Sequence, residues 1–273
     1  YIILCLPTLP LSYEKLTFYM IARVLNPKWT CIPIFLAFLS LILVVAGLSD
    51  GLGNNSFISR IDFIDGQIVR SINGANTPFW DSFMYQFTQK WLWVPFYISI
   101  VAFLTMNFTL KQMFFISISI VLVILLADQF CAGVLRPMFA RFRPSHSHLA
   151  DALHFVNGYR GGNYGFPSCH AANSVALATF LCYICRNHRV TLLLTVWFAL
   201  MGLTRMYLGV HYPSDLIVGS VIGIIIGGGI GFMCCRFSNV SPVTQTRLTW
   251  LPWTGLVLTC LWIIGRYLTD TFG

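Results

Sequence analysis

Long runs of apolar residues recur along this chain, and they narrow the folds open to it more than any other feature. Inside a bilayer a chain satisfies its backbone hydrogen bonds only as helices or as a closed barrel, and a crossing helix takes about 20 apolar residues. The chain is 57% hydrophobic and only 10% charged, whereas soluble domains carry roughly 25% charged residues. The sequence therefore predicts an all-α fold, a polytopic transmembrane helical bundle.

The apolar runs predict where the spans lie. A six-span core is expected from the runs at 31–48, 91–108, 113–135, 168–185, 190–208 and 213–235, and the run at 250–264 predicts a seventh, C-terminal span. Residues 12–29 mix charged and apolar side chains at helical spacing, which predicts an amphipathic helix at the membrane surface. We therefore divide the chain into an N-terminal amphipathic segment (1–29), a membrane domain (30–235) and a C-terminal connection with the additional helix (236–273).

A more polar section separates the first two predicted spans. Apolar residues recur at helical spacing from Ile61 to Ile72, which predicts a surface helix with one apolar face. Gly74 is expected to end this helix, and residues 76–81 predict a turn followed by a helix start.

Three polar clusters interrupt the apolar runs. The first extends from Arg136 to Arg143-Pro144, the second is Pro167-Ser168-Cys169-His170, and the third joins Thr204-Arg205 to His211 and Asp215. Ionisable groups at the edges of spans are costly unless they bind something, so they are functional candidates by default. Guanidinium groups without an equal number of carboxylates favour an anion with several oxygens, of which phosphate is the obvious example.

The charges of the short loops predict an orientation. One side of the predicted bundle carries an excess of basic residues over the single acid Glu14, namely Lys15, Arg23, Lys28, Lys111, Arg186, Arg189, Arg236 and Arg247. The positive-inside rule makes that side cytoplasmic. All three polar clusters then fall on the opposite side, where they can form one site.

The second cluster has the pattern of a helix N-terminus. Ser168 directly precedes an apolar helical run and is a natural N-cap. The amides of Cys169 and His170 would then point outward from the first turn, which is a ready anion site. His170 on that turn could donate a proton to a leaving group.

The third cluster predicts a nucleophile. His211 and Asp215 are four residues apart at the start of the sixth span, so on a helical turn the carboxylate can accept a hydrogen bond from one ring nitrogen and orient the other. His211 is thus a candidate nucleophile. Arg205 can contribute charge stabilisation.

Several other polar residues allow alternative interpretations. We expect Arg141 to face lipid headgroups or solvent, and Asp128 to face the bundle interior and pair with a basic group. A thiol nucleophile at Cys169 is a conceivable alternative. The spacing Cys182-x-x-Cys185 most simply places two residues on a helix. A metal site could use His146, His148, Asp151 and His154, but His-x-His patterns are common by chance and we expect no metal and no cofactor.

Taken together, the three clusters resemble those of the type 2 phosphatidic acid phosphatase family, which shares its site with vanadium haloperoxidases and glucose-6-phosphatase. The family pattern is Lys, six residues, Arg-Pro, then Pro-Ser-Gly-His, then Ser-Arg, five residues, His, three residues, Asp. All spacings match, over about 80 residues. Three residues depart from the pattern: Arg136 replaces the lysine, Cys169 the glycine and Thr204 the serine.

The resemblance implies a role for each site residue. His211 would attack phosphorus and form a phosphohistidine, Asp215 would orient it, and His170 would protonate the leaving oxygen. The implied phosphate-binding residues are Arg136, Arg143, Ser168, Cys169 through its amide, and Arg205. The family's route implies catalysis without a metal.

The expected function is hydrolysis of a membrane lipid phosphate or diphosphate at the outer face of a bacterial inner membrane, the periplasmic side. Undecaprenyl diphosphate or a lipid A phosphate is the favoured substrate, with phosphatidylglycerol phosphate as a further candidate. The alternatives are a lipid-to-lipid phosphotransferase and a non-hydrolytic binder or transporter of anionic lipids. The bilayer and its lipid are the expected partners. Nucleic acid is excluded because the basic residues form no clustered stripe. The sequence leaves the oligomeric state open.

Overall fold

The computed structural model describes residues 56–238, 240, 242–243 and 246–272. Within these ranges the longer elements are all helices, and the one isolated β-bridge joins Phe142 to Tyr164. The helices are α3 (Ser56–Gly74), α4 (Pro78–Phe87), α5 (Val94–Asn107), α6 (Leu110–Gln129), α7 (Arg136–Phe139), α8 (Cys169–Cys185), α9 (His188–Tyr207), α10 (Pro213–Phe237) and α11 (Leu251–Phe272). The all-α prediction is confirmed. The predicted helix at 12–29 and span at 31–48 lie outside the described residues.

Four helical stretches among the described residues are long and apolar enough to cross a membrane: Leu110–Phe139, His188–Tyr207, Pro213–Phe237 and Leu251–Thr271. The bent pair Pro78–Phe87 and Lys90–Asn107 would make a fifth, and Cys169–Cys185 is a shorter apolar helix. These helices coincide with the later predicted spans, including the C-terminal one. The predicted surface helix that ends at Gly74 is also present, as α3.

The predicted span at 91–108 is present as the helical segment Lys90–Asn107, and the chain bends sharply just before it. A 3₁₀ turn, Lys90–Trp93, precedes α5, and the helical axis bends by 73° between α4 and this segment. Two local features explain the corner. The Trp93 indole donates a hydrogen bond to the Phe87 carbonyl at 2.8 Å, and Pro95 occupies the first turn of α5, where its missing N–H costs nothing.

A wider π-helical turn separates α6 from α7, at the start of the first polar cluster. Between α6 and α7 the residues Phe130–Leu135 form a π-helix. Pro137 follows directly and has no N–H to donate to the preceding turn, so the regular α-helical ladder cannot continue through it. Ala140 then adopts the left-handed conformation, with φ of 46°, and turns the chain out of the helix.

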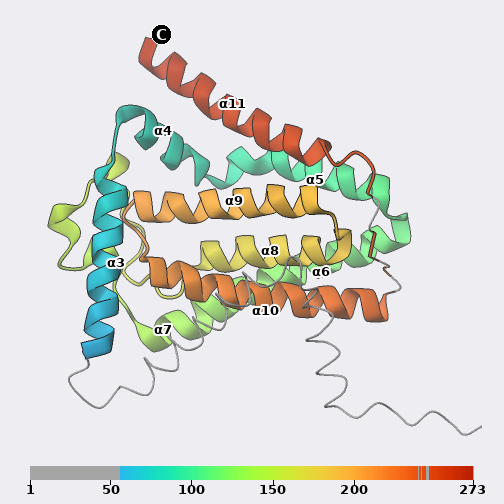
Figure 1. Cartoon of the computed structure of the whole chain (residues 1–273), viewed down its shortest axis with the longest axis horizontal. Coiled ribbons are helices and arrows are strands. Elements are labelled where there is room, and N and C mark those ends of the chain that lie inside the picture. Colours follow the sequence, from blue (N-terminus) through green and yellow to red (C-terminus); the bar gives the residue numbers. More distant parts are fainter. Residues whose placement is uncertain (1–55, 239, 241, 244–245, 273) are drawn as a thin grey trace, which may run out of the picture.

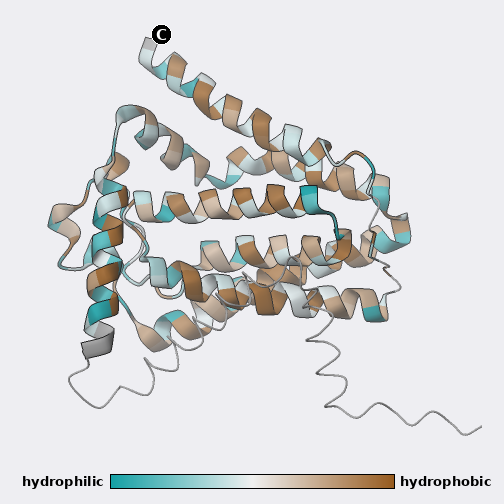
Figure 2. Ribbon diagram, in the orientation of Figure 1, coloured by the Kyte–Doolittle hydropathy of each residue, from teal (hydrophilic) through white to brown (hydrophobic). Residues whose placement is uncertain are grey.

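Helix α8 lies in the middle of the bundle and packs most extensively against α10, and also against α6 and α9. Helix α11 packs along α5 and contacts α4 and α9. Figure 1 shows α3 standing across one end of α9 and α10, almost at right angles to them. Hydrophobic residues cover the bodies of the long helices, and hydrophilic residues gather toward their ends (Figure 2).

Glycines allow α10 to lie directly against α8. A Cβ added at Gly223 would lie 2.6 Å from the Ala172 carbonyl oxygen and 2.8 Å from the Ala176 nitrogen, and one at Gly227 would also meet the Ala176 carbonyl oxygen. Small residues of this kind permit close helix packing in lipid. The same contact sets the two helix N-termini side by side, because the Ser168 amide donates to the Asp215 carbonyl at 3.0 Å.

Candidate active site

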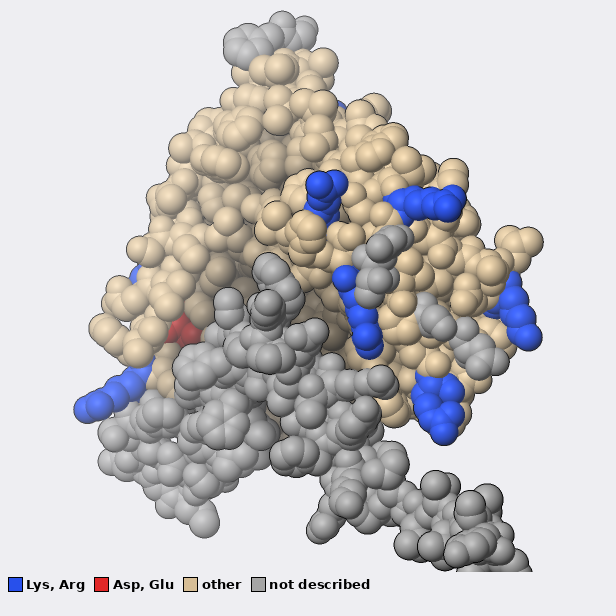
Figure 3. Space-filling view, turned by 45° about the vertical axis from the view of Figure 1, so that its right-hand side comes forward, with Lys and Arg blue, Asp and Glu red and all other residues tan. Residues whose placement is uncertain are grey.

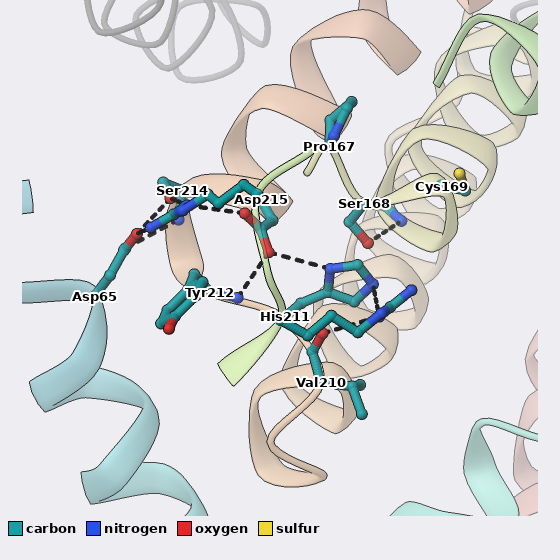
Figure 4. A network of polar contacts seen from close by, with 12 residues as sticks. Asp65, Pro167, Ser168, Cys169, Val210, His211, Tyr212, Ser214 and Asp215 are labelled. Carbon is teal, nitrogen blue, oxygen red and sulfur yellow. Dashed lines mark hydrogen bonds and ion pairs between the residues drawn. The ribbon is translucent and has the colours of Figure 1, made fainter. Parts of the chain in front are cut away.

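The three predicted clusters meet at the end of the bundle that α3 crosses. Helix α7 begins with Arg136, the loop after it carries Arg143, and the first turn of α8 carries Cys169 and His170. Arg205 lies in the last turn of α9, and Asp215 in the first turn of α10. Figure 4 shows His211 between Asp215 on one side and the start of α8 on the other. The prediction that the clusters form one site is confirmed.

The hydrogen bonds of His211 define its tautomer. Its Nε2 lies 2.8 Å from Nη1 of Arg143, and its Nδ1 lies 3.2 Å from Oδ2 of Asp215. A guanidinium can only donate, so Nε2 must be the acceptor and Nδ1 must carry the proton that goes to Asp215. The lone pair of Nε2 therefore points at an arginine that can bind phosphate.

The surroundings of His211 keep it neutral. Its side chain is 1% exposed. Burial, followed by the charges of Arg143, Arg205 and Arg136, lowers the pKa of His211 well below its usual value. Burial and the two neighbouring arginines also lower the pKa of Arg143 to about 10, which still leaves it cationic at neutral pH. A neutral imidazole beside cationic guanidiniums is what an attack on a phosphate ester needs.

The three arginines leave donors unused. The Nε atoms of Arg136, Arg143 and Arg205 are all buried and have no hydrogen-bond partner within the described part of the chain. A buried unpaired donor is rare and calls for a physical reason. Three such donors on cations around one imidazole are explained by an anion that supplies the missing acceptors.

The other bonds of Arg136 and Arg205 hold their side chains in place. Arg136 donates from Nη2 to the Cys169 sulfur at 2.9 Å and to the Pro167 carbonyl at 3.3 Å. Arg205 donates to the hydroxyls of Thr88 and Tyr159, the latter at 3.1 Å. Thr88 and Tyr159 were missed at the level of sequence, because a single hydroxyl in a loop or at a helix end carries no recognisable pattern.

The start of α8 has the predicted capped form. The Ser168 side chain accepts from the Ala171 amide at 3.4 Å and is fully buried, so in this structure its hydroxyl serves as the N-cap. The first amides of a helix have no acceptor within the helix, which leaves those of Cys169 and His170 to an anion. The first turn of α8 also carries the His170 imidazole. It lies within electrostatic reach of Arg205, His211 and Arg143.

The prediction that Arg141 faces headgroups or solvent is wrong. Its guanidinium bonds Asp215 Oδ1 at 2.9 Å and Asp65 Oδ2 at 2.8 Å, and its side chain is only 24% exposed. The segment after Ala140 is extended and pairs with the loop before α8, through Arg143 N to Asn163 O and Gly165 N to Arg141 O. Alternate residues of an extended segment point to the same side, so Arg141 faces the site together with Arg143.

Asp65 was also missed at the level of sequence. It lies on α3 and is only 4% exposed. Besides Arg141, it accepts from the Ser214 amide at 3.1 Å and from the Ser214 hydroxyl. Its position within the helical pattern of α3 was the available signal, but its partners lie far away in the chain.

Three further interpretations of the sequence concern His154, Asp128 and the two cysteines near the end of α8. His154 Nε2 pairs with Asp81 at 2.8 Å, and across the described residues no group of three or more His, Cys, Asp or Glu side chains could hold a metal ion. Asp128 accepts from the Asn173 carboxamide at 3.1 Å, so the expected basic partner is wrong. Cys182 and Cys185 are free thiols within α8.

Comparison with known proteins agrees with this geometry. Residues 117–240 match the family model of the PAP2 superfamily. The chain is 46% identical over 168 residues to a lipid A 4'-phosphatase of Bacteroides thetaiotaomicron, covering 61% of this chain and 75% of that one. A lipid A 4'-phosphatase of Porphyromonas gingivalis is 38% identical over 167 residues, covering 60% and 70%.

The fold is also found among solved structures. A PAP2 type phosphatidylglycerolphosphate phosphatase from Bacillus subtilis superposes with a TM-score of 0.54 at 20% identity, over 75% of this chain and 96% of that one. Fold and site together define a membrane-embedded phosphoric ester hydrolase. The chain belongs to the PAP2 superfamily, and the resemblance to the type 2 phosphatidic acid phosphatases is confirmed.

The charge environment of His211 predicts the pH dependence of turnover. Because its pKa is lowered, the imidazole stays neutral through neutral pH, and activity is lost only as the pH falls through that lowered value. Replacing Arg143 by Gln removes one cation that lowers the pKa, so the acid limb of kcat/KM should move to higher pH by roughly one unit.

The measurement is a pair of pH–rate profiles, of the wild type and of Arg143→Gln, on one substrate. Ionisation of the substrate phosphate affects both profiles equally, so the difference between them measures the change in the pKa of a group of the protein. An acid limb that stays in place or moves to lower pH in the variant contradicts the assignment of that limb to His211.

Proposed function

We propose that this membrane lipid phosphatase removes the 4'-phosphate of lipid A by way of a phosphohistidine on His211. The observation that carries the chemistry is the set of unpaired buried Nε donors on Arg136, Arg143 and Arg205 around the neutral His211. The observation that carries the substrate is the 46% and 38% identity to lipid A 4'-phosphatases.

The first chemical step follows from the donors and acceptors. Arg143 transfers its hydrogen bond from Nε2 of His211 to a phosphate oxygen, which frees the lone pair to attack phosphorus. The P–O bond to the sugar breaks, and His170 gives the leaving oxygen its proton. The positive imidazole that results is stabilised by its hydrogen bond to Asp215. Arginines and first-turn amides offset the charge of the transferring group.

The second step returns the enzyme to its starting state. His170, now neutral, accepts a proton from water as the water oxygen attacks the phosphohistidine. The P–N bond breaks and its electrons return to Nε2 of His211, while inorganic phosphate leaves. One proton thus moves from water to His170 for each turnover, which restores the acid for the next substrate.

A cavity that none of the site residues lines, but that reaches Tyr85, suits a sugar headgroup. Its volume is about 610 Å³ and its lining includes Tyr85, Gln86, Gln89 and Asn157. Pockets of this size hold small ligands, and carboxamides both donate to and accept from hydroxyl and amide groups. The Tyr85 ring packs against Tyr159, whose hydroxyl binds Arg205. A phosphorylated sugar lipid could therefore extend from the phosphate site toward this cavity.

The charges near the helix ends support the orientation that we propose. Lys111 lies in the first turn of α6 and Arg236 in the last turn of α10, while Arg186 follows α8 and Arg189 lies in the first turn of α9. These positions are at the end of the bundle opposite α3, and Figure 3 shows basic side chains with little acidic surface on the face turned forward there. Basic loops remain in the cytoplasm, so we propose that the site faces the periplasm of a bacterial inner membrane.

The orientation can be measured by cysteine labelling. A cysteine introduced at Arg160, in the loop before α8, should react with a membrane-impermeant thiol reagent in cells with permeabilised outer membranes. A cysteine at Asn187, between α8 and α9, should react only after the inner membrane is opened. The opposite pattern would place the site in the cytoplasm.

Substrate choice is tested with the purified protein and a panel of lipids. We expect lipid A carrying a 4'-phosphate to be hydrolysed with the highest kcat/KM, above lipid A with only a 1-phosphate, undecaprenyl diphosphate and phosphatidic acid. Released phosphate is the measurement. A preference for undecaprenyl diphosphate would overturn the substrate. Phosphate release that requires an added lipid acceptor would indicate a phosphotransferase, and binding without release an anionic-lipid binder.

The covalent step is tested by trapping the phosphoenzyme. With ³²P-labelled substrate and a rapid alkaline quench, the wild type should retain acid-labile label. His211→Ala should retain none and show no turnover, and His170→Ala should turn over about 100- to 10,000-fold more slowly, as expected for loss of a positioned acid.

Two additions separate this route from a metal-dependent one. Orthovanadate should inhibit, because it mimics the five-coordinate transition state, whereas EDTA should leave turnover unchanged. Activity lost with EDTA and restored by a divalent ion contradicts the mechanism. Label that survives in His211→Ala would move the nucleophile elsewhere, and Cys169→Ser then tests the thiol.

A further inference from the structure

We propose that Asp65 and Arg141 are positioning residues for the phosphoryl-transfer step, and that through them α3 holds Asp215, and hence His211, in the reactive orientation. The inference deepens the proposed histidine mechanism and rests on it. Arg141 lies within the first polar cluster, but the sequence predicted no role for it in the site. Asp65 lies on α3, which the sequence predicted only as a surface helix.

Both oxygens of the Asp215 carboxylate accept hydrogen bonds. Oδ2 accepts from His211 Nδ1 at 3.2 Å and from the Tyr212 amide at 3.0 Å, and Oδ1 accepts from Arg141 at 2.9 Å. The carboxylate is 1% exposed, so water cannot replace a missing donor. Loss of the Arg141 bond would leave Oδ1 unpaired and the carboxylate free to rotate away from the imidazole.

Arg141 is itself held from several sides. Its Nη2 bonds Asp65 at 2.8 Å and Asp62 at 2.7 Å, while Nη1 also donates to the Ser214 hydroxyl at 2.6 Å. The guanidinium carbon lies 4.3 Å from the centre of the Tyr212 ring. The two terminal nitrogens of one planar guanidinium thus link the two helices. Nη2 binds carboxylates of α3 and Nη1 binds the first turn of α10, a geometry that Lys cannot reproduce.

Asp65 is the anchor of this chain of contacts. It is 4% exposed, and besides Arg141 it binds both the amide and the hydroxyl of Ser214, the residue directly before Asp215. Asp62, by contrast, has a side chain that is 55% exposed, so solvent screens its ion pair. Asp65 therefore fixes the helix start and the arginine together, and Asp62 contributes little.

Charge also distinguishes Arg141 from the phosphate-binding arginines. Three carboxylates surround Arg141, and its bonds use both terminal nitrogens. Arg136, Arg143 and Arg205 retain unpaired Nε donors instead. Arg141 consequently has no role in holding the phosphate, and its removal should affect the rate of the chemical step rather than the binding of substrate.

The backbone at Gly165 packs closely against His211 and Asp215 and leaves these two side chains no room to move toward the loop before α8. A Cβ added at Gly165 would lie 3.0 Å from Arg143 Cγ, 3.2 Å from Asp215 Oδ2 and 3.5 Å from His211 Nδ1. The Gly165 amide donates to the Arg141 carbonyl at 2.9 Å. The loop thus packs against the His211–Asp215 pair beside Oδ2, and Arg141 binds the other carboxylate oxygen, Oδ1.

The test compares Arg141→Gln, Arg141→Lys and Asp65→Asn with two matched controls, Arg160→Gln and Asp151→Asn, which change the same charges at exposed positions of the neighbouring loop. We expect kcat to fall by roughly 10- to 100-fold in Arg141→Gln, since small misplacements of reacting groups cost about that much. Asp65→Asn should cost about 5- to 10-fold, and the controls less than about 2-fold. KM and the inhibition constant of orthovanadate should change by less than about 3-fold, because the phosphate site is intact.

Two further measurements separate positioning from general damage. Asp65→Asn added to Arg141→Gln should cost little more than Arg141→Gln alone, because Asp65 acts through the arginine. Guanidinium ion added to Arg141→Ala should restore part of kcat, while the same ion should not restore kcat in His170→Ala, where an imidazole is lost. The double variant also removes one positive and one negative charge together, so it tests the idea even if a single variant folds poorly.

The outcomes are distinct. If kcat is unchanged in Arg141→Gln and Asp65→Asn while His211→Ala is inactive, the positioning role is wrong and the histidine mechanism stands. If KM and vanadate inhibition worsen as much as kcat, the residues support substrate binding and the proposal is overturned. If His211→Ala remains active, the proposed mechanism itself fails, whatever Arg141 does.

Discussion

The active site depends on how closely α8 and α10 approach each other. Helix α8 begins with Cys169 and His170, whose amides we assign to the phosphate, and the first turn of α10 carries Asp215, which binds His211. Glycines on α10 let the two backbones touch, and the Ser168 amide binds the Asp215 carbonyl at 3.0 Å. Lipid offers no hydrophobic drive between helices, so close packing and hydrogen bonds of this kind must hold them together. The closely packed pair of α8 and α10 therefore holds both the proposed nucleophile and the proposed anion site.

Electrostatics divides the arginines of this end of the molecule into two kinds. Arg141 is neutralised by the carboxylates of Asp62, Asp65 and Asp215. Arg136, Arg143 and Arg205 have no carboxylate partner among the described residues and keep buried donors unpaired. A low-dielectric site makes both arrangements effective, because buried charges interact strongly there and water cannot compensate for them. In the proposed mechanism the paired arginine positions Asp215 and the unpaired arginines bind the phosphate, and the charges of the unpaired arginines also lower the pKa of His211.

The sequence predicted most of this site because its signals are local. Ser168 lies just before an apolar helix, and His211 and Asp215 are spaced by one helical turn, so their geometry follows from the chain itself. Joint spacing of the three clusters then identified the family. The predicted helices at 168–185, 190–208 and 213–235 likewise follow from long, largely apolar runs. The interpretation of Arg141 was wrong because the extended pairing of residues 141–143 with 163–165 comes from tertiary structure.

The sequence by itself thus determined the membrane-embedded helical class, the order of the helices and the candidate site residues, among them His170, His211 and the three arginines that keep unpaired donors. The length of an apolar run and the spacing of nearby residues are properties of neighbouring positions, so they can be recognised without knowledge of the fold. Only the tertiary structure decided that α4 and α5 meet at a 73° bend, that Thr88 and Tyr159 hold Arg205, and that Asp65 reaches the site. Those contacts join residues far apart in the chain, and their partners are selected by packing, which no local pattern records.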